Sequence, residues 1–252
     1  MPIAVTPLPQ RHVRQFTLLS NNVRMLSTEE ISIIALSLKV AAVSVLFSVP
    51  LALACAMLLA RVTFPGKTLF DAVVHLPLVL PPVVIGYFLL VLFGKKGAIG
   101  SVLDQWFGVT FAFRWTGAAL AAAVMGFPLM VRAMRLSLEA VPPKLEWAAR
   151  TLGATRWRVF LTVTLPLALP GVAVGVLLAF ARSLGEFGAT ITFVSNIPGE
   201  TQTLPLAIYT LTQSPGADSA IMRLCALSIA LSLAALAASE WINRRLQKRL
   251  GA

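Results

Sequence analysis

Charged residues are scarce in this chain of 252 residues, because only 12% are Asp, Glu, Lys or Arg. Soluble domains carry about twice that share. The chain is also 58% hydrophobic, which is more apolar material than a water-soluble core of this size can bury. The scarcity of charge therefore excludes an ordinary soluble domain and indicates that lipid is the solvent.

Cysteine, histidine and acidic residues are few as well. Cys55 and Cys225 both lie in apolar runs, where we expect small buried hydrophobes rather than a disulfide or metal ligands. Two His and ten acids supply no HExxH, GxSxG or other catalytic constellation. The segment PGKT at 65–68 resembles a phosphate-binding loop, but Arg61 stands where that loop requires glycine. The sequence thus predicts no catalytic residue, no metal site and no cofactor site, including none for ATP, in this chain.

Most of the chain consists of long apolar runs with few charged residues. A helix needs about 20 residues to cross roughly 30 Å of hydrocarbon, and runs without alternation exclude a membrane β-barrel. The predicted fold class is all-α, a polytopic membrane bundle with five spans and a possible sixth partial one. The expected spans are residues 31–60, 72–94, 115–135, 159–185 and 220–241. Residues 191–217 hold three prolines, and either dip partway into the membrane or form a plain extracytoplasmic loop.

The spans divide the chain and orient it. Residues 1–28 are expected to be a poorly structured N-terminal extension, followed by one transmembrane domain over 29–249. An odd number of spans puts the two termini on opposite sides. Lys and Arg are more numerous on the side that holds residues 132–158 and the C-terminus, which is therefore predicted to be cytoplasmic, with the N-terminus periplasmic. Loop charge of this kind accounts for the net charge of +11 without nucleic acid.

Residues 137–158, between the third and fourth spans, form a charged segment. Pro142 and Pro143 suit the entry to a helix. Apolar residues then recur at helical spacing on one face: Leu145, Ala148, Ala149 and Leu152. This face either packs on lipid headgroups or, because its alanines are small, fits a groove in another protein.

Other residues in the segment set its local structure. Glu146 stands four residues before Arg150, the favourable order for an ion pair along one helix. Gly153 is predicted to end this helix in the left-handed conformation. Thr155 is predicted to cap the next helix, which runs on into the fourth span.

Two stretches resemble a known family. AARTLGATRWRVFLTVTLP resembles the cytoplasmic EAA loop of bacterial ABC importer permeases, although Trp147 occupies the place of the motif's glutamate and Glu146 stands one position earlier. The positions that fit the motif are Ala148, Ala149, Gly153, Val163, Leu165 and Pro166. FARSLGEFGATITFVSNIPGETQTLP and HLPLVLPPVVIGY resemble the permease subunit of molybdate importers, whose architecture tungstate and sulfate permeases share.

The resemblance implies a function and partners. It implies an inner-membrane permease that imports a tetrahedral oxyanion, with molybdate preferred over tungstate or sulfate. Two copies would form a homodimer, embedded in membrane lipid, that binds two cytoplasmic ABC ATPase subunits and a periplasmic oxyanion-binding protein. ATP and Mg would be bound by the ATPase subunits. By resemblance, the segment is a coupling helix, and its ATPase-coupling residues are Glu146, Trp147, Ala148, Ala149, Arg150, Gly153, Ala154, Leu165 and Pro166.

Five residues are candidates for the pathway or its gate: Lys39, Pro81, Pro82, Arg182 and Glu186. Arg182 and Glu186 either form a structural ion pair at a helix end or act at the gate. Lys39 either snorkels or faces a wet cavity that favours an anion. The prolines kink or break the second span. An ion-driven secondary transporter is the less favoured alternative, because no clear internal repeat is present.

Overall fold

The computed structural model describes residues 27–250, which form helices and connecting loops with no strand among them. Three of the helical segments long and apolar enough to cross a membrane are α2 (Thr28–Arg61), α6 (Trp115–Ala140) and the run Arg156–Leu184. A fourth is α12 (Asp218–Leu250), whose apolar part ends at Ala238. The predicted all-helical membrane bundle is confirmed. Most of the predicted N-terminal extension, residues 1–26, lies outside the described residues.

Shorter helices complete the described part of the chain. The run Arg156–Leu184 consists of α8 (Arg156–Val159), a π-helical turn η2 (Phe160–Thr164) and α9 (Leu165–Leu184). The others are α3 (Lys67–Val79), α4 (Pro82–Phe93), α5 (Gly100–Phe107), α7 (Pro143–Thr151), α10 (Gly188–Val194) and α11 (Leu204–Thr212).

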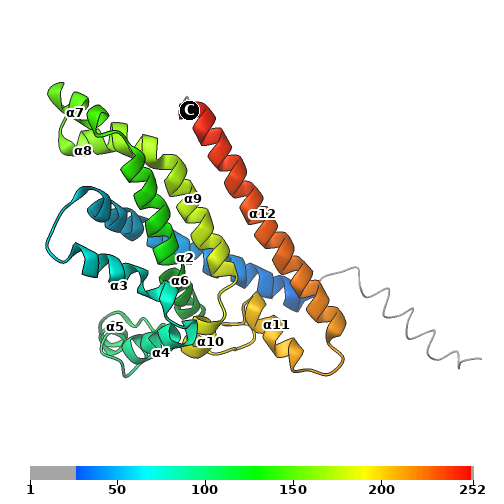
Figure 1. Cartoon of the computed structure of the whole chain (residues 1–252). Coiled ribbons are helices and arrows are strands. Elements are labelled where there is room, and N and C mark those ends of the chain that lie inside the picture. Colours follow the sequence, from blue (N-terminus) through cyan, green and yellow to red (C-terminus); the bar gives the residue numbers. More distant parts are fainter. Residues whose placement is uncertain (1–26, 251–252) are drawn as a thin grey trace, which may run out of the picture.

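Helix α6 is the centre of the bundle and packs along both α2 and α9 (Figure 1). Small residues allow the close approach of α9, because a Cβ added to Gly171 would overlap the side chain of Ser137 on α6. A Cβ on Gly175 would lie 3.0 Å from the carbonyl oxygen of Met130. This glycine pair therefore packs two helices of one chain and is not available to join two copies.

The second predicted span, residues 72–94, is not one continuous helix. Helices α3 and α4 meet at an angle of 113°. Leu80 and Pro81 between them are extended, with ψ of 144° and 134°. Proline lacks an N–H donor and disfavours the helical conformation in the residue before it, so the pair Pro81–Pro82 forces the preceding residues out of the helix. The prolines break this segment, as the sequence analysis expected of the second span.

The first part of the segment 191–217 is packed against protein, whereas residues 213–216 form an exposed loop. Thr201, Gln202 and Thr203 are all buried. The backbone N–H of Leu204 donates to Oγ of Ser37 on α2 at 2.8 Å. Helices α10 and α11 carry the two halves of the segment, which closes one end of the bundle (Figure 1).

The two ends of the bundle carry different elements. Helices α7 and α8 lie at one end, together with the C-terminal end of α12 (Figure 1). Helices α10 and α11 and the start of α12 lie at the opposite end. The start of α2 is there too, because Glu30 pairs with Arg223 of α12 at 3.0 Å. The segment 137–158 and the C-terminus thus share one end, as the sequence predicts.

Candidate functional site

The segment after α6 folds locally as its sequence predicts. Pro142 is the N-cap of α7 and Pro143 its first residue. Gly153 has a φ of 83°, the left-handed conformation that glycine adopts without strain. Oγ1 of Thr155 accepts a hydrogen bond from the backbone N–H of Arg158 and caps α8. A short helix and a sharp turn therefore precede the fourth span.

Glu146 is directed into the protein and pairs with Arg61, the last residue of α2, at 2.8 Å between Oε1 and Nη2. The same oxygen accepts a hydrogen bond from Oγ1 of Thr164 in η2 at 2.8 Å. Nη2 of Arg61 also lies 3.0 Å from the carbonyl oxygen of Leu138 and 3.3 Å from that of Val141, at the end of α6. One carboxylate thus fixes α7 to three neighbours: α2, α6 and the turn that leads into α9.

The predicted pair between Glu146 and Arg150 is wrong. Arg150 is exposed, whereas the Glu146 side chain is only 12% exposed. A pair along one exposed helix contributes only a few tenths of a kcal/mol. A shielded carboxylate that accepts from a guanidinium and a hydroxyl gains more, so Glu146 turns inward. Sequence reasoning missed Arg61, whose only signal was its position as the first charge after the first span.

The outer face of this segment is apolar and open. Trp147 is 62% exposed and Leu152 89% exposed. Leu145 and Trp157 are exposed as well, Ala148 is exposed, and Ala149 is half-buried. Large exposed apolar side chains beyond the spans are typical of a site that another protein covers. Two exposed tryptophans, Trp147 and Trp157, add apolar surface to this segment beyond the positions that the sequence analysis named.

The connection from this segment to α9 contains the π-helical turn η2. Pro166 is within the first two residues of α9 and cannot donate a backbone hydrogen bond to the preceding turn. The wider turn accommodates that missing donor, and π-helical turns are frequent at functional sites. Leu165 and Pro166 therefore stand where α7 and α8 are joined to the fourth span.

Arg182 and Glu186 form the ion pair that their spacing predicts, at 2.6 Å. The Glu186 side chain is only 2% exposed, and its second oxygen accepts from the backbone N–H of Ala189 at 2.9 Å. The pair therefore joins the end of α9 to the start of α10. Helix α10 packs on α4, and Gly188 lies directly against Pro82. The structure thus brings Arg182, Glu186 and the proline break together.

Lys39 lies elsewhere. Its Nζ is 3.6 Å from the ring centroid of Trp115, the first residue of α6, and the side chain is exposed. Tryptophan is enriched at membrane interfaces, and a lysine beside it is typical of a snorkelling side chain. The structure supports the snorkelling alternative for Lys39 and separates this residue from the other four pathway candidates.

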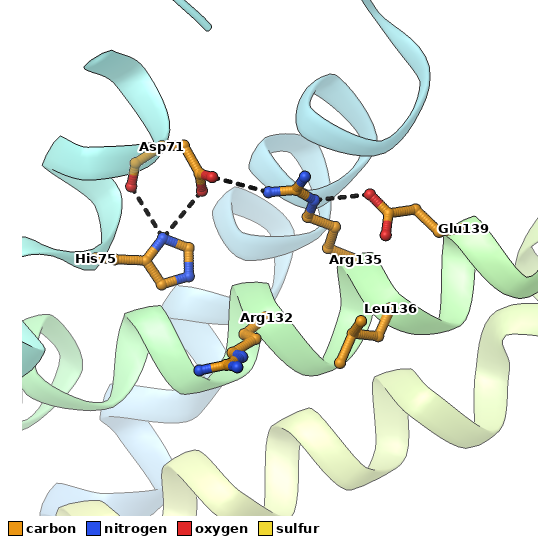
Figure 2. Close-up of a pocket in the computed structure, with 6 residues that line it drawn as sticks. All are labelled: Asp71, His75, Arg132, Arg135, Leu136 and Glu139. Atoms are coloured by element: carbon orange, nitrogen blue, oxygen red, sulfur yellow. Dashed lines mark hydrogen bonds and ion pairs between the residues drawn. The ribbon is translucent and has the colours of Figure 1, made fainter. Parts of the chain in front are cut away.

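A second polar cluster, which the sequence analysis did not assign to the pathway, lies between α3 and α6 (Figure 2). Arg135 pairs with Asp71 of α3 at 3.0 Å and with Glu139 at 2.8 Å. Nδ1 of His75 lies 3.0 Å from Oδ1 of Asp71. With Arg132 and Leu136, these residues line a cavity of about 310 Å³. Sequence reasoning missed the cluster because its members come from two helices more than 50 residues apart.

Comparison with known proteins adds to this geometry. Residues 48–250 match the family described as binding-protein-dependent transport system inner membrane component. The chain is 64% identical over 227 residues to the molybdenum transport system permease protein ModB of Escherichia coli K12, covering 90% of this chain and 99% of that protein. It is 63% identical over 222 residues to ModB of Haemophilus influenzae, covering 88% and 97%. It is 42% identical over 167 residues to the sulfate transport system permease protein CysT of E. coli K12, covering 66% and 60%.

Solved structures share the fold. A bacterial ABC transporter involved in the import of the acidic polysaccharide alginate contains a chain with a TM-score of 0.70 and 20% identity, covering 92% of this chain and 83% of that one. A second structure shows a bacterial alginate ABC transporter in complex with an alginate pentasaccharide-bound periplasmic protein, with a TM-score of 0.70, 20% identity, and coverage of 93% and 83%. The bundle described above is therefore the fold of an ABC importer permease.

Proposed function

The chain belongs to the family of binding-protein-dependent transport system inner membrane components, and from this membership we propose that it is the permease subunit that carries molybdate inward in an ATP-driven importer. The observation that carries the proposal is the identity of 64% to a molybdenum permease over 99% of that protein's length. Similarity of this extent includes both the membrane spans and the segment 137–158.

The proposed assembly contains two copies of this chain, two cytoplasmic ABC ATPase subunits and a periplasmic oxyanion-binding protein. ATP and Mg are bound by the ATPase subunits, because this chain lacks a phosphate-binding loop. The alginate transporter with its bound periplasmic protein supports the arrangement by analogy of fold. In this orientation α7 and the C-terminus face the cytoplasm, and the start of α2 faces the periplasm.

Helix α7 is the proposed coupling helix. Its exposed apolar side chains, with Trp147 in the helix and Leu152 at its C-cap, receive the ATPase subunit. Glu146 passes the displacement to α2 and α6 through Arg61, and to α9 through Thr164. The linked helix ends then move as one rigid body, which is a common route to alternating access.

The far end of α9 transmits this movement to the proposed gate. The pair between Arg182 and Glu186 joins α9 to α10, and α10 contacts the break at Pro82. Backbone that leaves the helix at membrane depth is tolerated where it is buried in protein or lines a cavity. The break between α3 and α4 is therefore the proposed position of the gate.

Sulfate and tungstate are the alternative cargoes, and the relative CysT favours sulfate as the second candidate. An experiment that separates them reconstitutes the chain in liposomes with the ATPase and binding protein of the same bacterium. ATP-dependent uptake of molybdate is expected, with little competition from sulfate. Preferential uptake of sulfate or tungstate would reassign the cargo, and uptake by the chain alone under an ion gradient would identify a secondary transporter.

A further inference from the structure

The cavity between α3 and α6 is lined by five ionisable side chains, and the proposed mechanism does not use it. Asp71 and His75 reach it from α3, and Arg132, Arg135 and Glu139 reach it from α6 (Figure 2). Its volume of about 310 Å³ exceeds the roughly 30 Å³ share of one water molecule about tenfold. The cavity therefore has room for a small hydrated ion.

The position of the cavity along the helices is unusual for so many charges. Arg132 stands eight residues before the end of α6, which is about 12 Å of helix. Asp71 stands four residues after the start of α3. Ionisable side chains within a span face the bundle interior or a water-filled cavity, and this cluster lies near the cytoplasmic end of the predicted span 115–135. The end of α6 leads to the end of the bundle where α7 lies (Figure 1).

The two arginines have different surroundings. Arg135 lies between two carboxylates and is paired with both, Asp71 at 3.0 Å and Glu139 at 2.8 Å. Arg132 forms no ion pair with any side chain that the structure describes, and it is exposed to the cavity. The charge of Arg135 is therefore compensated, whereas that of Arg132 is available to an anion.

His75 supplies a second group. Its Nδ1 lies 2.9 Å from the backbone carbonyl oxygen of Asp71 and 3.0 Å from Oδ1 of the same residue, so this nitrogen carries the proton, which is donated to the carbonyl. Figure 2 shows the other ring nitrogen turned away from Asp71, toward the side on which Arg132 lies. When the ring is protonated, this nitrogen donates into the cavity.

We propose that this cavity is a transient site for the tetrahedral oxyanion on the cytoplasmic side, with Arg132 as its contact cation. The inference rests on the proposed function, because it requires an anionic cargo and the stated orientation. The nearby carboxylates of Asp71 and Glu139 keep the affinity low, which suits a site from which the anion must leave. Arg135 is a positioning residue that holds α3 against α6.

The test probes the cavity directly. Leu136 lines it and is 60% exposed, so Leu136→Cys is introduced after Cys55→Ser and Cys225→Ser. The permease–ATPase complex is placed in nanodiscs of phosphatidylcholine. The rates of reaction with an anionic and a cationic methanethiosulfonate reagent are then measured, with and without millimolar molybdate. Molybdate is expected to slow the labelling.

Arg132→Gln should abolish this protection and lower the ratio of anionic to cationic labelling about tenfold, because one charge about 6 Å away in water changes each of the two rates about threefold in opposite directions. Arg132→Lys should keep the ratio, which controls for misfolding. Arg244→Gln removes a 72% exposed arginine far along α12 and should change neither value. The proposal would be overturned if molybdate did not change the labelling rate and Arg132→Gln did not change the ratio of anionic to cationic labelling.

Two further measurements are needed. One distinguishes a lipid headgroup from the transported oxyanion as the bound anion, and the other distinguishes failure of the cavity site from failure of the proposed function. Adding phosphatidylglycerol to the nanodiscs tests a lipid headgroup: protection by this lipid but not by molybdate would assign the cavity to lipid and overturn the inference. Import of molybdate by a complex whose cavity is unprotected would reject the site alone. Protection in a complex that imports only another oxyanion would reject the cargo and leave an oxyanion site.

Discussion

At the scale of single residues, two carboxylates form bonds to groups outside their own helix, and these bonds hold separate elements together. Glu146 could pair with Arg150 on α7 but contacts Arg61 and Thr164 instead. Glu186 pairs with Arg182 and also accepts from the start of α10. In both cases a shielded carboxylate joins elements that are separate in the chain, and hydrogen bonds to a charged group are stronger than neutral ones.

Glu146→Gln should lower ATP-dependent import about tenfold, because a hydrogen bond to a charged group contributes about 1.5 kcal/mol. ATPase activity should fall less than import, since α7 still binds its partner but is no longer fixed to α2. Import and ATP hydrolysis measured on the same proteoliposomes would check the ratio. Arg61→Gln should give the same defect, and the double variant should be no worse than either single one. Additive losses would show that the two residues act separately.

Glu186→Gln should lower stability by roughly 3 kcal/mol, since removal of one partner leaves Arg182 partly buried without its counter-charge. Thermal unfolding in detergent would measure the loss. Glu240→Gln, at an exposed pair on α12, is the matched control and should change stability by less than about 1 kcal/mol. Unchanged stability together with ATP-independent leakage of the anion would instead assign Glu186 to the gate alone.

At the scale of elements, the contact between α4 and α10 depends on the absence of side chains. A Cβ on Gly86 of α4 would lie 2.5 Å from the carbonyl oxygen of Ala189 and 2.8 Å from Cβ of Thr192. Such distances are too short for a real side chain, and backbone oxygen cannot move aside without shifting α10. The proline break lies at the start of α4, so this contact fixes the angle of the whole bent segment.

Gly86→Ala should therefore destabilise the protein by about 1–3 kcal/mol, the range for overpacking a well-packed interface. It should also reduce import, because α10 must shift from the break. Gly185→Ala is the matched control, since the nearest atom would be 4.0 Å from its new Cβ and its φ is negative. Thermal unfolding and import measured on both variants would check this, and equal effects would contradict the packing argument.

At the scale of the whole molecule, the bundle has two chemically different ends. One carries the open apolar face of α7, and the other carries the buried loop around Thr201 and the pair between Glu30 and Arg223. The proposed mechanism requires these ends to lie on opposite sides of the membrane. The mechanism therefore depends on the orientation of the whole chain in the membrane.

Single cysteines can show on which side of the membrane each end of the bundle lies. In a chain with Cys55→Ser and Cys225→Ser, Leu152→Cys should react with an impermeant thiol reagent only in inside-out vesicles. Ser214→Cys, in the exposed loop between α11 and α12, should react only in right-side-out vesicles. The excess of Lys and Arg at the α7 end is the physical reason for this orientation. The reverse pattern would overturn both the orientation and the coupling mechanism.

Much of this could be predicted from the sequence, because lipid makes local patterns decisive. In hydrocarbon every backbone group must be satisfied within its own segment, so a long uncharged run is a helix wherever it lies in the fold. Proline and glycine act through their own backbone, and a capping side chain acts on an N–H three residues away, which is why the entry at Pro142, the left-handed Gly153 and the cap at Thr155 were predicted correctly.

The tertiary structure alone decided which side chains meet. The pairs of Glu146 with Arg61 and of Arg135 with Asp71 join residues 85 and 64 positions apart, and no local pattern contains such a distance. The bend of 113° was likewise only half-determined by its prolines, since proline removes a hydrogen bond but does not set the direction of the next helix. Packing set that direction, through the glycines that let α4 and α10 touch.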